Sequence, residues 1–446
     1  MVKFAFYALS YTIMPQTITE KILAKTSKKH KVVPGELIWA DVDVLMTHDP
    51  CSPGVIGVFK KQFGANAKVW DNSKHVMIPD HFIFTADSKA NENITLMRNF
   101  AKEQEIKYFY DVGTPEYKGV CHIALAEGGH TRPGELLVGT DSHTVTSGAF
   151  GQVGIGVGNT DAAFILGTGK IFLRVPHSIK VEFNGTLPIN VTSKDLILRV
   201  VGDLGVSGAT YSAIEFCGSL VENMNVEERM TLCNMVTECG GKNGIIAPNA
   251  ETIDFVKSRT NIDFDIITSD PKAQYIKTLV YDVSEFTPYV AKPYSPDNLD
   301  TLENVKGRKI DRAYLGSCTG GKISDFIAAA TILKNNKVSI TTFAVPATKE
   351  VLTTIIDTKI DGESVYSILK NAGVHVSFET GCAACCGGPL DTFGRVNEPL
   401  SVISATNRNF PGRMGNKEAR IYLASPYTVA ATAIKGEISD PIEFLA

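Results

Sequence analysis

The sequence lacks a long apolar run, an excess of basic charge and a cysteine pattern suited to disulfide bonds. No stretch reaches the roughly 18 apolar residues that a membrane-spanning helix needs, so we expect a soluble protein. The 446 residues carry 44 Lys and Arg against 48 Asp and Glu, and the formal net charge of −4 disfavours a dedicated nucleic-acid binder. Hydrophobic residues make up 44% and charged residues 21%, which excludes wholesale disorder.

Targeting signals are also scarce at the start of the chain. Residues 1–13 contain a single lysine and no convincing small-residue cleavage site, which argues against a secretory signal. They are not rich in arginine and serine, as an organelle transit peptide would be. We therefore expect a disordered leader over residues 1–13, with the folded chain beginning at Met14.

Nine cysteines cannot all pair in disulfide bonds. This odd number favours a reducing compartment in which free thiols have a chemical role. Three of them lie together, and Cys382 and Cys385 have the C-x2-C spacing that places two thiolates on one tight turn. Cys318 lies far upstream in Leu-Gly-Ser-Cys-Thr-Gly-Gly, between a predicted strand and a predicted helix. Two separate loops thus offer three cysteines.

Three interpretations of these cysteines remain open from the residues alone. Three thiolates on two loops can hold three corners of an iron–sulfur cube. A structural zinc site needs four protein ligands, and a fourth is not evident because Cys386 directly follows Cys385 and should point elsewhere. Buried structural thiols are the third alternative.

Short β-branched segments alternate with helical patterns along the chain. Residues 323–335 and 349–358, for example, have helical patterns, and strand-like segments end in polar or glycine-containing loops. This alternation predicts an α/β fold with largely parallel sheets flanked by helices. In such sheets the functional loops lie at the carboxyl ends of the strands.

Two changes in composition suggest domain boundaries. Residues 174–188 read as a connection into a new strand, and the proline-rich residues 289–300 read as an irregular linker over a surface. We therefore predict three domains, and their ranges are 14–178, 179–287 and 288–446.

Polar residues gather where the predicted strands end. Asp80 and His81 follow one strand, and Asp141, Ser142 and His143 follow another. A histidine beside a carboxylate can act as a general acid or base near neutral pH. Two Asp–His combinations at strand ends therefore indicate a catalytic site.

Further candidate residues lie elsewhere in the chain. Asn234 and Glu238 are four residues apart, so they should share one face of a helix. Arg408 and Arg413 lie on one glycine-containing loop, which suits bidentate recognition of carboxylates. His122 is a further candidate.

A glycine-rich segment looks at first like a nucleotide-binding loop. Residues 154–159 read Gly-Ile-Gly-Val-Gly-Asn and do not satisfy the G-x-G-x-x-G spacing. We expect tight packing near the loop of residues 141–143 instead of a dinucleotide site.

Together these motifs resemble the aconitase superfamily over essentially the whole chain from Met14 onward. The segments that carry the resemblance are residues 47–54, 138–144, 234–238, 316–319, 381–385 and 407–413. The resemblance implies a three-domain aconitase-like architecture without the swivelling fourth domain of single-chain members. It also implies a hydro-lyase.

The resemblance further implies a cofactor and a role for each candidate residue. Cys318, Cys382 and Cys385 would hold one 4Fe–4S cluster whose fourth iron has no protein ligand, and Asp80 with His81 would protonate the departing hydroxyl. Residues implied to order water and hydroxyl at the metal are His122, Asp141, His143, Asn234 and Glu238. Residues implied to bind substrate are His48, Ser142, Asn407, Arg408 and Arg413, with His48 at a position where citrate-type members carry glutamine.

The missing fourth domain implies a partner. A separate small subunit would complete the site and supply the base for the C–H proton. The implied substrate is a small 2-hydroxy dicarboxylic acid, namely isopropylmalate in leucine biosynthesis. The alternatives are a large subunit that acts on homoaconitate or on methylmalate and citraconate, and, more remotely, an RNA-binding regulatory relative. No nucleic acid or membrane partner is expected, and both a bacterial cytoplasm and a plastid stroma fit.

Overall fold

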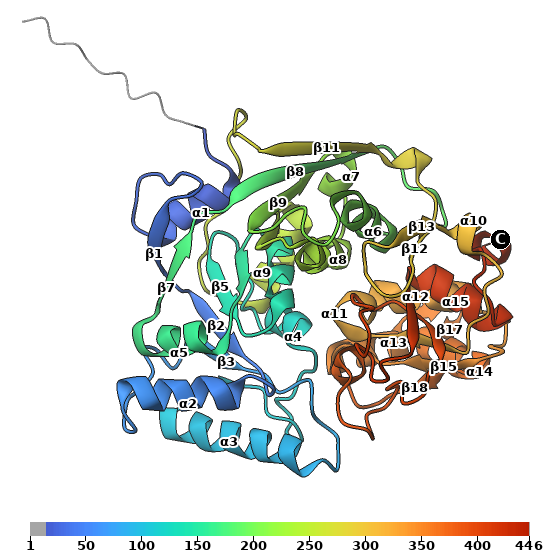
Figure 1. Ribbon diagram of the computed structural model, residues 1–446, viewed down its shortest axis with the longest axis horizontal. Coiled ribbons are helices and arrows are strands. Elements are labelled where there is room, and N and C mark those ends of the chain that lie inside the picture. The colour runs from blue at the N-terminus through green and yellow to red at the C-terminus, as the bar shows by residue number, and fades with distance from the viewer. Residues whose placement is uncertain (1–14, 446) are drawn as a thin grey trace, which may run out of the picture.

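The computed structural model describes residues 15–445, so the predicted leader over residues 1–13 lies outside the described residues. Helices surround three main β-sheets that follow one another along the chain (Figure 1). The predicted α/β fold, with parallel and mixed sheets flanked by helices, is confirmed. No helix in this part of the chain is both long enough and apolar enough to cross a membrane.

The first sheet has five parallel strands in the order β4-β3-β2-β5-β6. Its register pairs Thr47 with Met77 and Met46 with Gly139, so β2, β3 and β5 end at the same edge. A separate antiparallel ribbon joins β1 and β7. The strands are β1 Leu37–Asp41, β2 Val44–Thr47, β3 His75–Met77, β4 Tyr108–Phe109, β5 Leu136–Gly139, β6 Val153–Gly156 and β7 Lys170–Arg174. The helices are α1 Ile18–Thr26, α2 Ser52–Phe63, α3 Ser88–Gln104, α4 Cys121–Glu127, the 3-10 helix η1 Ser142–Phe150 and α5 Asn159–Thr168.

The second sheet has four parallel strands in the order β10-β9-β8-β11. Its long strands β8 and β11 run side by side along the top of Figure 1. The strands are β8 His177–Asn184, β9 Ser212–Cys217, β10 Asn243–Ile246 and β11 Lys277–Asp282. The helices are α6 Ser193–Leu204, α7 Ser219–Glu222, α8 Val226–Asn234, η2 Met235–Cys239, α9 Ala250–Arg259 and η3 Val283–Glu285.

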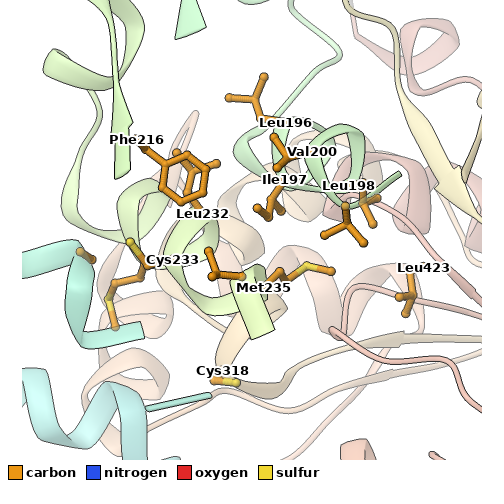
Figure 2. Packing of buried hydrophobic residues seen from close by; sticks show 14 of the residues in the cluster. Leu196, Ile197, Leu198, Val200, Phe216, Leu232, Cys233, Met235, Cys318 and Leu423 are labelled. Carbon is orange, nitrogen blue, oxygen red and sulfur yellow. The ribbon is translucent and has the colours of Figure 1, made fainter. Parts of the chain in front are cut away.

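Helix α6 shows how the core beside the second sheet is built. Its first turn is closed by a capping box, in which the Asp195 carboxylate accepts the N–H of Thr192. Its fully buried leucine, isoleucine and valine side chains belong to one apolar cluster with Phe216 of β9 and Leu423 (Figure 2). Because Leu423 comes from the third sheet, the second and third sheets share one core.

The third sheet is mixed and has seven strands in the order β13-β12-β20-β19-β14-β15-β18. Tyr314 pairs in parallel with Ser404, so the loops that carry Cys318 and Asn407 leave the same edge of the sheet. The strands are β12 Tyr289–Ala291, β13 Leu299–Thr301, β14 Arg312–Leu315, β15 Thr341–Ala344, β18 His375–Val376, β19 Ser401–Ser404 and β20 Arg420–Leu423, with a small hairpin of β16 Lys359–Ile360 and β17 Glu363–Ser364. The helices are α10 Leu302–Val305, α11 Ser317–Gly320, α12 Ile323–Leu333, α13 Lys349–Asp357, α14 Val365–Ala372, η4 Ala383–Cys386, α15 Pro426–Lys435 and η5 Pro441–Phe444.

Residues 289–300 differ from the predicted irregular linker. They form most of a hairpin, in which β12 pairs antiparallel with β13 and also with β20. Val290 and Ala291 are fully buried, so this segment contributes to the core of the third sheet. The prediction of a surface linker was wrong because only the central, proline-containing part of the segment turns, while its ends pair with strands distant in sequence. The predicted domain boundaries at 178/179 and 287/288 stay predictions.

A half-buried carboxyl group at the end of α4 predicts a pH-dependent stability. Burial raises the pKa of Glu127 from 4.5 to about 7, and the Thr348 hydroxyl donates to this carboxyl. The folded chain therefore holds a proton that the unfolded chain releases between pH 4.5 and 7, so this group stabilises the fold least above pH 7. We compare the free energy of unfolding of Glu127→Gln with that of the native chain. The difference, variant minus native, should be about 2 kcal/mol larger at pH 8 than at pH 5.

Urea unfolding of both chains at the two pH values checks this expectation. Glu92→Gln is the matched control because Glu92 is exposed on α3. A difference between native chain and Glu127→Gln that stays constant with pH would contradict the proposed titration.

Candidate active site

An acid pair lies just beyond the end of β3. Asp80 is fully buried, and its Oδ1 lies 2.7 Å from Nδ1 of His81. Its other oxygen accepts the backbone N–H of Cys121 at 2.8 Å. Burial alone would lower the pKa of His81, but Asp80, with smaller contributions from Cys386 and Asp141, raises that pKa well above the usual value. His81 is therefore protonated at neutral pH.

Asp141 lies at the centre of four histidines. It caps the start of η1, and its Oδ1 accepts the N–H of His143 at 2.7 Å and lies 3.0 Å from Nε2 of His122. Its Oδ2 lies 3.6 Å from Nε2 of both His48 and His81. Burial would raise the pKa of Asp141, but hydrogen bonds from His122 and His143 hold it well below the usual value. The carboxylate is thus ionised and shared among the histidines.

A second carboxylate links a histidine to an arginine. Glu238 Oε1 lies 2.8 Å from Nε2 of His143, and the Nε of Arg408 donates to both Glu238 oxygens at 3.1 and 2.9 Å. Burial and the Arg408 charge would lower the pKa of His143, but hydrogen bonds to Asp141 and Glu238 raise it to about 9. This chain of charges crosses from the first sheet through η2 to the loop after β19.

The shared helical face predicted for Asn234 and Glu238 was wrong in one respect. Helix α8 ends at Asn234, and Glu238 lies in the 3-10 helix η2. Gly244 of β10 lies close to this segment, because a Cβ on it would lie 3.1 Å from the backbone of Cys233. Both side chains nevertheless reach the site.

An amide network surrounds one of the three cysteines. Asn234 donates from Nδ2 to the sulfur of Cys318 at 3.1 Å, and Asn407 donates to the same sulfur at 3.4 Å. The hydroxyl of Thr319 donates to Asn234 Oδ1 at 2.6 Å, which fixes the orientation of that amide. The Cys385 thiol lies 3.3 Å from Asn407 Oδ1. Donors aimed at sulfur stabilise a thiolate.

The three predicted cysteines converge from two loops. All three are buried, and Cys318 and Cys385 both contact the side chain of Asn407. Interaction with the Cys382 thiol is the main cause that lowers the pKa of Cys318 well below its usual value and that of Cys385 to about 6. The neighbouring Cys386 thiol instead lies 3.3 Å from the carbonyl oxygen of Ala383. The arrangement thus brings soft sulfur donors from two loops to the neighbourhood of Asn407.

Two buried polar atoms in this site have no hydrogen-bond partner among residues 15–445. They are Nδ1 of His122 and Nε of Arg413. Nitrogen or sulfur atoms of His122, His143 and Cys318 also lie within 4.8 Å of one another. Buried donors without partners and three convergent thiols fit a bound inorganic group together with an anionic ligand.

Ser142 lies apart from the thiols. Together with Asp141 and Gly156 it lines an adjacent hollow of about 590 Å³. Gly156 is required here, because a Cβ on it would lie 2.9 Å from Cα of Ser142. This close approach agrees with the packing expected for residues 154–159.

Two polar residues of the site were not among the sequence-based candidates. Thr319 orients Asn234, and Asp49 accepts hydrogen bonds from the backbone of residues 80–82. Thr319 directly follows Cys318. Asp49 comes after a strand and a histidine, and Asp141, which was among the candidates, also comes after a strand. That placement was the available signal for Asp49.

Comparison with known proteins agrees with this geometry. The model of the aconitase family (aconitate hydratase) matches residues 20–306 and 298–436. The chain is 53% identical over 441 residues to the chloroplastic 3-isopropylmalate dehydratase large subunit of Arabidopsis thaliana, covering 96% of this chain and 87% of that protein. It is 41% identical to 3-isopropylmalate dehydratase large subunit 1 of Methanopyrus kandleri, over 97% of this chain and 100% of that protein. It is 39% identical to a probable methanogen homoaconitase large subunit of Methanothermobacter thermautotrophicus, over 96% and 98%.

Proposed function

The chain belongs to the aconitase family, and from that membership we propose that it is the large subunit of a hydro-lyase that isomerises 2-isopropylmalate to 3-isopropylmalate through 2-isopropylmaleate in leucine biosynthesis. The observation that supports this choice of substrate is the 53% identity, over 96% of the chain, to a protein named 3-isopropylmalate dehydratase large subunit. The relative named homoaconitase makes homoaconitate the second candidate, at 39% identity.

Aconitase-family proteins carry iron–sulfur clusters, and we propose a 4Fe–4S cluster with three ligands in this chain. Cys318, Cys382 and Cys385 would hold it, leaving one iron without a protein ligand. Their burial, their convergence and the amide donors of Asn234 and Asn407 toward Cys318 support this assignment. When bound, the cluster supplies a Lewis acid that polarises substrate oxygen atoms.

His81 is the proposed proton donor to the departing hydroxyl. Its Nδ1 is held by Asp80, so its Nε2 is the atom free to transfer a proton, and it faces Asp141. The raised pKa of His81, caused mainly by Asp80 against the effect of burial, keeps that proton in place at neutral pH. A positioned general acid of this kind typically contributes about 10²–10⁴-fold to a rate.

The remaining residues would orient substrate and water. His122, Asp141, His143 and Glu238 form a hydrogen-bonded wall, which Asn234 joins through Thr146, and these residues would order the reacting hydroxyl and water. Arg408 and Arg413 would bind substrate carboxylates, and Arg413 has a buried Nε available for this purpose among the described contacts. Asn407, Ser142 and His48 would make further substrate contacts.

The base that removes the C–H proton is assigned to a partner. We propose a separate small subunit that covers this site and brings the base, consistent with relatives that are named large subunits. All nine cysteines are free thiols, which suits a reducing compartment such as a plastid stroma or a bacterial cytoplasm. The proposal thus places the cluster ligands and the proton donor in this chain, and the base in its partner.

Co-expression with the small subunit from the same genome tests the proposal. After anaerobic reconstitution with iron and sulfide, we expect the pair to form 2-isopropylmaleate from 2-isopropylmalate, followed by its ultraviolet absorbance. The large chain alone and a pair carrying Cys382→Ser should both be inactive. These two controls separate the need for the partner from the need for the cluster.

Two results would change the proposal. Turnover of homoaconitate or citraconate in place of 2-isopropylmaleate would retain the reaction class and replace the substrate. A chain that binds zinc, forms no iron–sulfur chromophore and shows no hydratase activity with its partner would overturn the function.

A further inference from the structure

A fully buried carboxylate, Asp49, lies beneath the acid pair. It follows His48 at the end of β2, and it has no exposed surface. No lysine, arginine or histidine nitrogen of residues 15–445 forms an ion pair with it. A buried carboxylate needs several hydrogen-bond donors to compensate for the water it has lost.

Three consecutive backbone N–H groups supply those donors. Asp49 Oδ1 accepts from the N–H of Asp80 at 2.9 Å and of His81 at 3.0 Å, and Oδ2 accepts from the N–H of Phe82 at 2.6 Å. Successive backbone N–H groups that face one anion form a rigid turn. The carboxylate therefore holds the backbone of both members of the acid pair.

The same turn contacts a cluster loop. The carbonyl oxygen of Asp80 accepts the N–H of Cys382 at 2.8 Å. Gly381 permits this approach, because a Cβ there would lie 3.1 Å from the Asp80 oxygen. Residues 80–82 are thus held between the Asp49 carboxylate and the loop that carries Cys382.

A metal ion shared by Asp49, Asp80 and His81 is a competing explanation, because their ligand atoms lie within 4.8 Å of one another. The oxygens already have other partners. Asp49 accepts the three backbone N–H groups, and Asp80 accepts from His81 and from the N–H of Cys121. The geometry favours a hydrogen-bonded support over a cation site.

We propose that Asp49 is a positioning residue that sets the backbone of Asp80 and His81, and through it the placement of the proton donor relative to the loop of Cys382. This inference rests on the proposed function only in the activity assay, because kcat can be measured only if the pair is the proposed enzyme. Asparagine is the informative replacement, since it offers one oxygen acceptor and turns an amide donor toward one of the backbone N–H groups. The turn should loosen while the volume of the side chain stays the same.

The test compares Asp49→Asn and Asp49→Ser with Asp43→Asn. Asp43 is a matched control because its carboxylate also bonds to the backbone, accepting the N–H of Leu136 at 2.9 Å, but it precedes β2 at the opposite end of the strand. In the reconstituted pair, we expect Asp49→Asn to lower kcat per bound cluster by about 10- to 100-fold and to change KM less than about 3-fold. Asp43→Asn should leave both values within about 2-fold of the native pair.

A second measurement needs neither the cluster nor activity. In the cluster-free chain, amide hydrogen exchange over residues 80–82 should rise at least about 10-fold in both Asp49 variants and stay unchanged in Asp43→Asn. Unchanged exchange at residues 80–82, or equal kcat losses in the Asp49 and Asp43 variants, would overturn the positioning role. Loss of the fold in both Asp49 variants, with Asp43→Asn folded, would overturn it too, because the carboxylate would then serve folding. An inactive native pair would instead count against the proposed function, and the exchange measurement would still decide the role of Asp49.

Discussion

Replacing Asp141 by asparagine is expected to lower kcat of the large–small pair by about 10³-fold while the chain remains folded. Its Oδ1 contacts His122 and His143, and its Oδ2 lies 3.6 Å from His48 and His81. Asparagine keeps the shape and loses the charge. One of its two groups becomes a donor that faces a histidine nitrogen.

The loss follows from the protonation states that this carboxylate maintains. Burial opposes protonation of His143, and the hydrogen bonds to Asp141 and Glu238 are what raise its pKa to about 9. Without the Asp141 charge, the pKa of His143 should fall, and the orientation of His122 through its Nε2 should be lost. The histidines around Asp141 depend on one shared carboxylate. The effects on kcat of single substitutions among these residues should therefore not be additive.

Steady-state kinetics of the reconstituted pair over a range of pH measure this effect. The matched control is Asp311→Asn, since Asp311 accepts the backbone N–H of Ser401 at 2.8 Å near the amino end of β14, at the opposite end of that strand from the loop of Cys318. We expect the control to retain kcat within about 2-fold. A kcat for Asp141→Asn within 10-fold of the native pair would contradict the role of the Asp141 charge in holding His122 and His143.

Sequence reasoning could locate the candidate residues because they follow strands of parallel sheets. The register that pairs Thr47 with Met77 and Met46 with Gly139 brings the residues after β2, β3 and β5 to one edge. Such edges are where parallel sheets place their functional loops. The order of strands along the chain therefore contains most of the information on which loops meet.

Sequence reasoning failed where a contact between distant segments decides the structure. The helix expected to carry both Asn234 and Glu238 ends at Asn234, and Glu238 lies in a 3-10 helix that packs closely against Gly244 of β10. The apparent linker at residues 289–300 pairs with β20, more than a hundred residues later. Asp49 has the same limitation, because its partners are backbone groups that no sequence pattern identifies.

Replacing Cys318 by serine is expected to abolish cluster binding and to reduce activity to the background of the cluster-free pair. A serine hydroxyl is a hard donor that remains protonated near neutral pH, whereas iron–sulfur clusters are held by thiolates. The fold of the cluster-free chain should persist, because the serine oxygen can still accept the N–H groups of Asn234 and Asn407. Iron and sulfide content per chain, together with the visible absorbance of the reconstituted protein, measure the effect.

Cys386→Ser is the matched control, because it removes a neighbouring thiol that is not a proposed cluster ligand. Cys386 follows Cys385 directly, but its thiol lies against the carbonyl of Ala383 and is not among the three convergent sulfurs. We expect Cys386→Ser to keep the iron content and the chromophore of the native chain. If Cys386→Ser lost the cluster while Cys318→Ser kept it, the ligands would come from the loop of residues 382–386 alone. Cluster binding would then not depend on the loop after β14 lying next to the loop after β18. Cys318 would be a buried thiol without a role as a ligand.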